Sequence, residues 1–355
     1  MAIPLGHPWR MARKFETLDG LRGVAALAVV LYHVPGPLHA FASAGYLAVD
    51  LFFLMSGFVI ASAYEARLCE GWRASEFLVV RLKRLWPLYA LGVALGVACF
   101  LGIRWLRPDA AFAFPPMPVA AAALLSLLFM PQIAPYGGPA FPFNSASWSL
   151  SVEIVGNVVY ALVARSLSTR MLMLMSAIGF AGLALIWWRA GALDVGVSPG
   201  NIAGGYVRFL FSFPLGILMY RLHAADRLSR LSPPAWLPLA LAAFAFAGWH
   251  GADLFIAAVL FPAILMMSLS NAVSPRVARV FVWAGAVSYP LYILHPPLIE
   301  LMRFLPRGIG DGVFVLAIIA LAALAQRWFD RPLQNVLHRL VQDVPRERLG
   351  AQPGA

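Results

Sequence analysis

The sequence predicts an all-α, polytopic integral membrane protein. Hydrophobic residues make up 61% of its 355 residues and charged residues only 12%, and the mean hydropathy is +0.78. A soluble domain could not easily cover its surface with so few charges. Several apolar runs also have the length of about 17–25 residues that a helix needs to cross a bilayer. We therefore expect about ten transmembrane helices.

The predicted crossings follow one another along most of the chain. They lie at 20–37, 45–63, 85–104, 148–164, 171–188, 203–220, 235–250, 253–272, 281–304 and 312–329. A further apolar segment at 111–133 is rich in proline, which interrupts helices. We expect this segment to be a re-entrant or interfacial piece that does not cross the membrane.

The basic residues between the apolar runs predict the orientation. With ten crossings and both termini in the cytoplasm, 21 lysines and arginines lie on the cytoplasmic side and six on the other. Residues 1–19 then form a cytoplasmic segment, 20–330 the membrane domain and 331–355 a cytoplasmic tail. The alternative is that 111–133 does cross and a weaker later segment does not.

The net charge of +11 does not by itself indicate a nucleic-acid partner. The basic residues form short clusters between apolar runs, and no aromatic–basic recognition motif accompanies them. Cys69 lies in a charged loop and Cys99 inside an apolar run, so we expect no disulfide and no metal site.

Three ionisable groups lie inside the apolar runs. His33 ends the first run, Asp50 lies near the start of the second, and Glu153 lies in SASWSLSVEIVGNVVY. A charged group at the centre of a bilayer costs about 3 kcal/mol or more, so each is a functional candidate. On the predicted orientation all three lie in the extracytoplasmic half. The alternative is that they only pair with buried donors and hold helices together.

Other polar side chains accompany these groups at helical spacing. Ser149, Glu153, Asn157 and Tyr160 predict a polar stripe on one helix face. In SYPLYILHPP, we expect three prolines to distort the helix around the histidine. The residues expected to contact or support the substrate are Ser147, Trp148, Ser149, Asn157, Tyr160, Tyr292 and His295. The alternatives are a helix–helix hydrogen bond for His295 and an interfacial anchor for Trp148.

The spacing of Arg22 and His33 places them on one face of a helix. Eleven steps of about 100° come to roughly three turns, with the two side chains about 16 Å apart along the axis. On the same predicted side as Arg22, Arg81 and Arg84 share a face at the start of a helix, which suits a phosphate group. The alternative is that these arginines only set the topology.

These stretches together resemble the membrane acyltransferase-3 family, the O-acetylases of bacterial surface glycans. The resemblance covers roughly residues 15–335. It is carried by Arg22 and His33 with ten residues between them, VDLFFLMSGFVI, Arg81-x-x-Arg84 before Trp86-Pro87-Leu88-Tyr89, SWSLSVE followed by Tyr160, and SYPLYILHPP.

The resemblance implies an acyl-CoA donor, usually acetyl-CoA, and no permanently bound cofactor. The acceptor would be a hydroxyl group on the outer side of the bacterial cytoplasmic membrane. The candidates are a lipopolysaccharide O-antigen sugar, an exopolysaccharide repeat, peptidoglycan, a lipid-linked saccharide and a small secondary metabolite. His33, the Arg81 and Arg84 pair, and Glu153 match the family's motif residues. Many members carry a fused extracytoplasmic hydrolase-like domain, which these 355 residues do not include, so the acceptor's identity is open.

A mechanism follows as a hypothesis. Arg22, Arg81 and Arg84 would hold the CoA phosphates, and His33 would act as general base or acyl relay. Glu153 or Asp50 would orient the His33 ring. The rival function is a proton-coupled transporter or flippase of a polar solute, because intramembrane ionisable groups serve proton coupling equally well. We detect no internal repeat that would favour a transporter.

Overall fold

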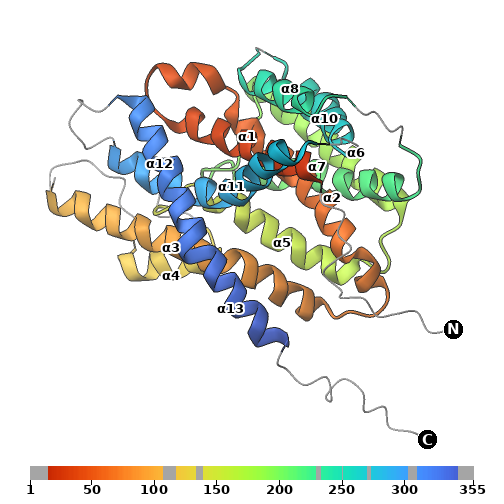
Figure 1. Ribbon diagram of the computed structural model, residues 1–355, viewed down its shortest axis with the longest axis horizontal. Coiled ribbons are helices and arrows are strands. Elements are labelled where there is room, and N and C mark those ends of the chain that lie inside the picture. Colours follow the sequence, from red (N-terminus) through yellow and green to blue (C-terminus); the bar gives the residue numbers. More distant parts are fainter. Residues whose placement is uncertain are drawn as a thin grey trace, which may run out of the picture.

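The computed structural model describes residues 15–106, 117–132, 139–228, 233–249, 251–269, 273–302 and 310–342 (Figure 1). Within these ranges all regular structure is helical and no strand is present, which confirms the predicted all-α class. The α-helices are α1 (Glu16–His33), α2 (Ala48–Cys69), α3 (Ala74–Leu106), α4 (Val119–Leu127), α5 (Ser147–Val163), α6 (Thr169–Ala190), α7 (Ile202–Ala224), α8 (Trp236–Phe246), α9 (Asp253–Phe255), α10 (Phe261–Met267), α11 (Pro275–Met302), α12 (Asp311–Ala325) and α13 (Arg331–Gln342).

Shorter helical turns join some of these helices. Two 3₁₀ turns, Pro37–Ala42 and Gly45–Leu47, connect α1 to α2. A π-helical turn at Ile256–Leu260 joins α9 to α10, and another at Gln326–Asp330 joins α12 to α13.

Among the described residues, six helical stretches are long and apolar enough to cross a membrane. They are Gly45–Cys69, Ala74–Leu106, Thr169–Ala190, Ile202–Ala224, Pro275–Met302 and Asp311–Leu337. Shorter apolar helices occupy Ser147–Val163, Trp236–Phe246 and Asp253–Met267. The chain is therefore an integral membrane protein with several apolar helices. The count of ten crossings stays a prediction.

The segment predicted to be re-entrant is described only in part, from residue 117 to residue 132. Its helix α4 has nine residues and is therefore about 14 Å long, less than half the thickness of the hydrocarbon core. Ala122 of α4 packs with Phe100 of α3 and Phe143. Helix α4 is thus too short to cross the membrane by itself.

Helix α1 ends at His33 because of the residues that follow it. Val34 precedes Pro35, and proline disfavours the helical conformation at the position before it. Val34 accordingly has an extended conformation, with ψ of 126°. Its backbone N–H still donates to Val30 O and closes the last turn. The histidine is therefore held at the end of a well-formed helix.

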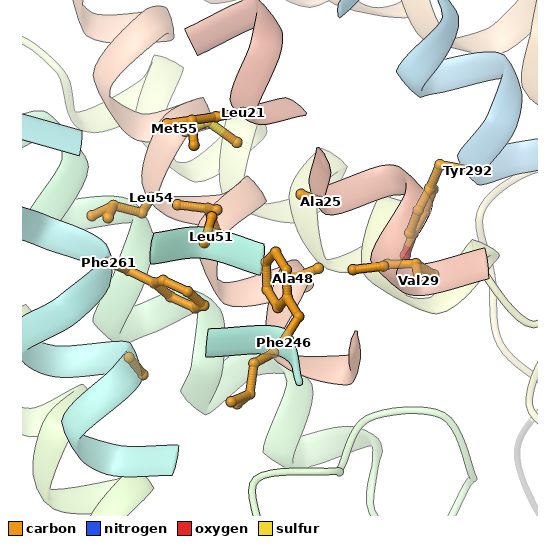
Figure 2. Close-up of a cluster of buried hydrophobic side chains, with 14 of the residues drawn as sticks. Leu21, Ala25, Val29, Ala48, Leu51, Leu54, Met55, Phe246, Phe261 and Tyr292 are labelled. Atoms are coloured by element: carbon orange, nitrogen blue, oxygen red, sulfur yellow. The ribbon is translucent and has the colours of Figure 1, made fainter. Parts of the chain in front are cut away.

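A core of apolar side chains fixes α1 and α2 in the bundle. Leu21, Ala25 and Val29 of α1 belong to one cluster with Leu51 and neighbouring α2 side chains (Figure 2). Side chains of α8 and α10 complete this cluster. Helices α2 and α7 approach closely because Gly57 and Gly216 have no side chains. A Cβ on either residue would collide with the backbone of the facing helix. Small residues are the usual means of such close packing in membrane helices.

Helix α11 runs without interruption through Pro290, Pro296 and Pro297, although we expected these prolines to distort it. A proline leaves the carbonyl four residues earlier without its helical donor. For Pro297 this carbonyl belongs to Ile293, and the Asn144 side-chain nitrogen donates to it at 2.8 Å. A neighbouring segment thus replaces the missing bond, which keeps His295 on a continuous helix.

Candidate active site

Two adjoining chambers lie between α1, α2, α3, α5 and α11. The larger, which we call the arginine cavity, has a volume of about 310 Å³. Its charged lining residues are Arg22, Arg81, Arg84 and Glu153. The smaller, which we call the histidine pocket, has a volume of about 40 Å³ and is lined by His33 and His295 among others. The structure therefore brings the predicted residues into two groups.

The arginine cavity has an excess of positive charge. Arg81 Nη2 lies 2.8 Å from Glu153 Oε1, and the same oxygen accepts a hydrogen bond from Ser56 Oγ at 2.7 Å. Within the described residues, neither Arg22 nor Arg84 has an ion-pair partner. Three guanidinium groups thus face one carboxylate. Arg81 is buried and Arg22 partly buried, and buried cations are costly unless paired, so this arrangement favours an anionic ligand.

The walls of the arginine cavity are largely apolar. Phe52, Met55 and Leu85 are among its lining residues. A ligand that fits must therefore combine an anionic end with a longer, less polar part. The predicted grouping of the three arginines holds in the structure.

The His33 ring is oriented by the backbone of its own helix. Its Nδ1 lies 2.8 Å from Val29 O. A carbonyl oxygen can only accept, so in the neutral ring Nδ1 carries the proton and Nε2 is the acceptor. This is the tautomer that a general base needs if Nε2 meets the substrate.

His295 stands next to His33 across the α1–α11 interface. The two ring centroids are 5.1 Å apart. His295 Nδ1 lies 3.2 Å from Leu291 O, so its neutral ring also has Nε2 as the acceptor. The residue is fully buried, and its Nε2 has no hydrogen-bond partner among the described atoms. His295 therefore lines the same pocket as the predicted base.

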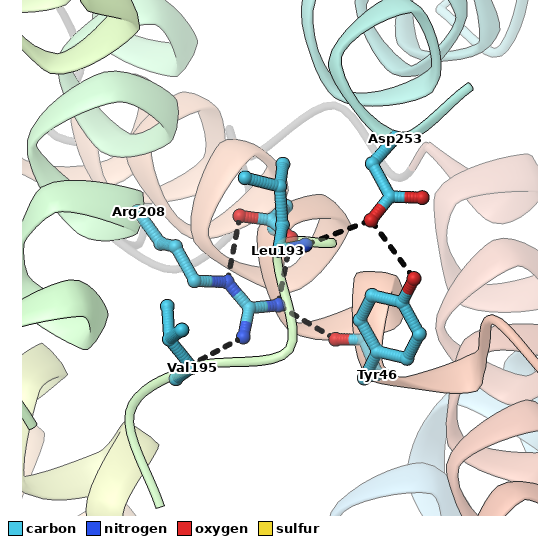
Figure 3. Close-up of polar contacts among 6 residues, drawn as sticks. Tyr46, Leu193, Val195, Arg208 and Asp253 are labelled. Carbon is cyan, nitrogen blue, oxygen red and sulfur yellow. Dashed lines mark hydrogen bonds and ion pairs between the residues drawn. The ribbon is translucent and has the colours of Figure 1, made fainter. Parts of the chain in front are cut away.

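Asp50, which we expected beside His33, is held by an arginine. Arg208 Nε lies 3.1 Å from Asp50 Oδ1, and Arg208 Nη2 lies 2.7 Å from Asp50 Oδ2. Arg208 also donates to the carbonyls of Val195 and Tyr46 (Figure 3). Both charged side chains are only 1% exposed. A bidentate, fully satisfied buried pair of this kind joins α2 to α7 and fixes the 193–195 segment beside it.

Arg208 is a residue whose role sequence reasoning missed. It was counted among the basic residues on the extracytoplasmic side, although it lies inside the apolar run 203–220. The rule applied to Asp50, that a charge in an apolar run has a partner, would have found it.

The carboxylate that lines the histidine pocket is Asp194, rather than Asp50 or Glu153. The Tyr32 hydroxyl donates to Asp194 Oδ2 at 2.7 Å. Asp194 follows α6 in a loop and belongs to no motif, so no signal in the sequence indicated it. Glu153 instead lies in the arginine cavity, and its shared depth with His33 did not predict that location.

Two further predicted residues line the chambers, and one of them, Tyr292, lines both. Tyr292 lines both the arginine cavity and the histidine pocket, and its hydroxyl lies 2.6 Å from Ser149 Oγ. Trp148 lines the histidine pocket, with the Arg208 guanidinium 5.4 Å from its ring centroid. The remaining predicted residues are buried but line neither chamber: Ser147, Asn157 and Tyr160.

Comparison with known proteins adds a family assignment to this geometry. A family model described as an acyltransferase domain matches residues 15–325. Protein 2 in the picA locus of Rhizobium radiobacter is 42% identical over 158 residues, which cover 42% of this chain and 81% of that protein. The peptidoglycan O-acetyltransferase OatA of Listeria monocytogenes is 24% identical over 92% of this chain.

This chain spans 57% of the length of the Listeria protein. No solved structure gave a significant match. The family model covers both chambers, because it includes α1, α3, α5 and α11. The chain belongs to the acyltransferase-3 family of membrane proteins, and its relatives include an O-acetyltransferase.

Proposed function

We propose that this protein transfers an acyl group from acyl-CoA, bound in the arginine cavity, to a hydroxyl group that enters the histidine pocket. One observation carries the proposal. An arginine-rich cavity and a pocket containing a correctly oriented imidazole adjoin each other, with Val49 and Tyr292 in the walls of both. A thioester donor with an anionic head and a hydroxyl acceptor need these two environments side by side.

The donor would lie with its phosphates at the arginines. Within the described residues, Arg22 and Arg84 form no direct ion pair with a carboxylate, so both are available to phosphate oxygens. The less polar pantetheine arm would then run along the apolar walls of the cavity. Arg22 and His33 are eleven residues apart on α1, which corresponds to about 16 Å. The arm would span this distance and bring the thioester to the pocket.

His33 would supply the base. Its Nε2 would take the proton of the acceptor hydroxyl as that oxygen attacks the thioester carbonyl carbon. The carbon–sulfur bond then breaks, and the proton returns from Nε2 to the departing thiolate. The products are an ester and free CoA. Val29 O would hold the ring in the required tautomer and would stabilise the imidazolium that forms.

The acceptor would be a glycan of the cell envelope, such as an exopolysaccharide, lipopolysaccharide or peptidoglycan unit. Support comes from the relatives, one of which is named for peptidoglycan. The chain would lie in the bacterial cytoplasmic membrane with both termini in the cytoplasm. The arginine cavity would then open to the cytoplasm, where acyl-CoA is made, and the histidine pocket would face the other side.

The test is consumption of acetyl-CoA by purified full-length protein in detergent, with a sugar acceptor or water as the nucleophile. We expect His33→Ala to abolish consumption while acetyl-CoA still binds. His223→Ala is the matched control, because this imidazole contacts Phe15 and Phe58 and lines neither chamber. A protein that binds no acetyl-CoA, or a His33→Ala variant with full activity, would contradict the proposal. A transporter would not consume the thioester.

A further inference from the structure

The boundary between the two chambers consists of few side chains. Val49 of α2 and Tyr292 of α11 line both chambers. Every other lining residue in the described chain belongs to one chamber only. The two chambers therefore meet at Val49 and Tyr292.

Tyr292 is held in place on several sides. Its hydroxyl lies 2.6 Å from Ser149 Oγ. Its ring centroid is 5.7 Å from that of Phe52 and 5.9 Å from that of His295. It reaches from α11 toward α1 near Val29 (Figure 2). The tyrosine is thus a fixed wall, because several contacts oppose its rotation.

Val49, the other side chain that lines both chambers, is also constrained. It is 6% exposed and packs in a cluster with Phe53 and Trp148. As a β-branched residue in a helix it has essentially one side-chain rotamer. Neither side chain can therefore move aside easily where the chambers meet.

The chamber beyond the passage is small. One water molecule needs about 10–15 Å³, so a pocket of about 40 Å³ holds roughly three water-sized groups. An acyl chain that continued into this pocket would occupy the space that the acceptor hydroxyl needs. A longer chain would have to turn back beside the thioester arm, and the passage would then have to hold two chains side by side.

We propose that Val49 and Tyr292 form the constriction that determines which acyl lengths the protein transfers. This inference rests on the proposed function. It goes beyond it by assigning donor selectivity to two residues that do not contact the CoA phosphates. Val49 is the better probe of the two, because Tyr292 also supports Ser149 and His295.

The experiment measures initial rates of CoA release from acetyl-, butyryl- and octanoyl-CoA by membrane vesicles that contain the full-length protein. Vesicles with the His33→Ala variant provide the background. We expect the wild type to prefer acetyl-CoA. We expect Val49→Ala to raise the butyryl-to-acetyl rate ratio by about tenfold or more, since a single methylene in a tight site is worth that much.

Val152→Ala is the matched control. Val152 is 1% exposed, belongs to the same cluster as Val49 and lines neither chamber. We expect it to leave the rate ratio unchanged. Val49→Leu, which narrows the passage, should lower the butyryl-to-acetyl ratio and keeps the test decisive if Val49→Ala does not fold. Tyr292→Phe should retain the wild-type ratio, because the ring remains.

Three results would overturn the inference. They are a wild type that uses octanoyl-CoA as well as acetyl-CoA, an unchanged ratio in both Val49 variants, or an equal change in Val152→Ala. In each case acyl-CoA would still be consumed, so the proposed function would stand. Failure of the wild type to bind or consume any of the three donors would instead refute the proposed function, and the inference with it.

Discussion

The arginine cavity predicts a graded loss of donor affinity when its cations are removed one at a time. Arg22 is partly buried and forms no direct ion pair among the described residues, so Arg22→Gln removes a charge without breaking a salt bridge. A hydrogen bond to a charged group contributes about 1.5–3 kcal/mol. The variant should therefore bind acetyl-CoA about 10- to 100-fold more weakly.

Arg84 should matter less than Arg22. Its side chain is exposed, so its attraction to phosphate is screened by water and salt. Exposed ion pairs contribute up to about 1 kcal/mol, which corresponds to at most about a fivefold loss in affinity for Arg84→Gln. Arg81→Gln would confuse the comparison, because it would leave Glu153 with a missing partner.

The assay is calorimetric titration of the purified protein with acetyl-CoA and, separately, with S-acetylpantetheine. The second ligand has the thioester arm without the nucleotide and its phosphates. If the arginines bind phosphate, the variants lose affinity for acetyl-CoA and retain affinity for S-acetylpantetheine. The same loss for both ligands, or a larger effect for Arg84→Gln than for Arg22→Gln, would refute this assignment.

Three further predictions concern the framework of the site, and each is checked by thermal unfolding in detergent. Asp50→Asn should destabilise the protein by about 3–5 kcal/mol because it leaves Arg208 buried without its counter-charge. The apolar double variant Asp50→Leu with Arg208→Met should recover part of that loss. An Asp50→Asn variant as stable as wild type would contradict the structural role of the pair. Asn144→Ala should cost about 1–3 kcal/mol because Ile293 O loses the side-chain donor that replaces its helical one, and the control is Asn201→Ala in the 193–201 loop, where the bonds are local. Gly57→Ala should lower stability or prevent assembly of α2 against α7, while Gly102→Ala, which meets nothing nearby, should leave stability unchanged; equal stability of both variants would contradict the close packing.

Much of the helical framework could be predicted from the sequence, because apolar runs of spanning length have few alternatives to helix in a membrane. The predicted runs coincide with helices, and Pro35 ends the first helix directly after His33. Where a run is short or contains charges, as at α8 or α1, composition alone does not decide whether the helix crosses. Residues 1–14, where part of the predicted cytoplasmic segment falls, lie outside the described residues.

The sequence predicted which residues belong to the candidate site better than it predicted which of them pair with each other. Spacing predicted Arg22 and His33 on one helix, about 16 Å apart, and in the structure both lie on α1, with Arg22 lining the arginine cavity and His33 the histidine pocket. Depth in the membrane is a weaker guide, because it says nothing about which helices are neighbours. Asp50 therefore pairs with Arg208 on α7, more than 150 residues away in sequence, and Glu153 pairs with Arg81.

The central claim is that the arginine cavity and the histidine pocket are the two ends of one acyl-transfer path. Its most direct test is radiolabelled acetyl-CoA supplied to one side of sealed membrane vesicles from expressing cells, which retain the native acceptor. We expect label to enter the acceptor only in inside-out vesicles, where the arginine cavity meets the solution, and only with His33 intact. Incorporation from right-side-out vesicles, or undiminished incorporation by the His33→Ala variant, would contradict the claim.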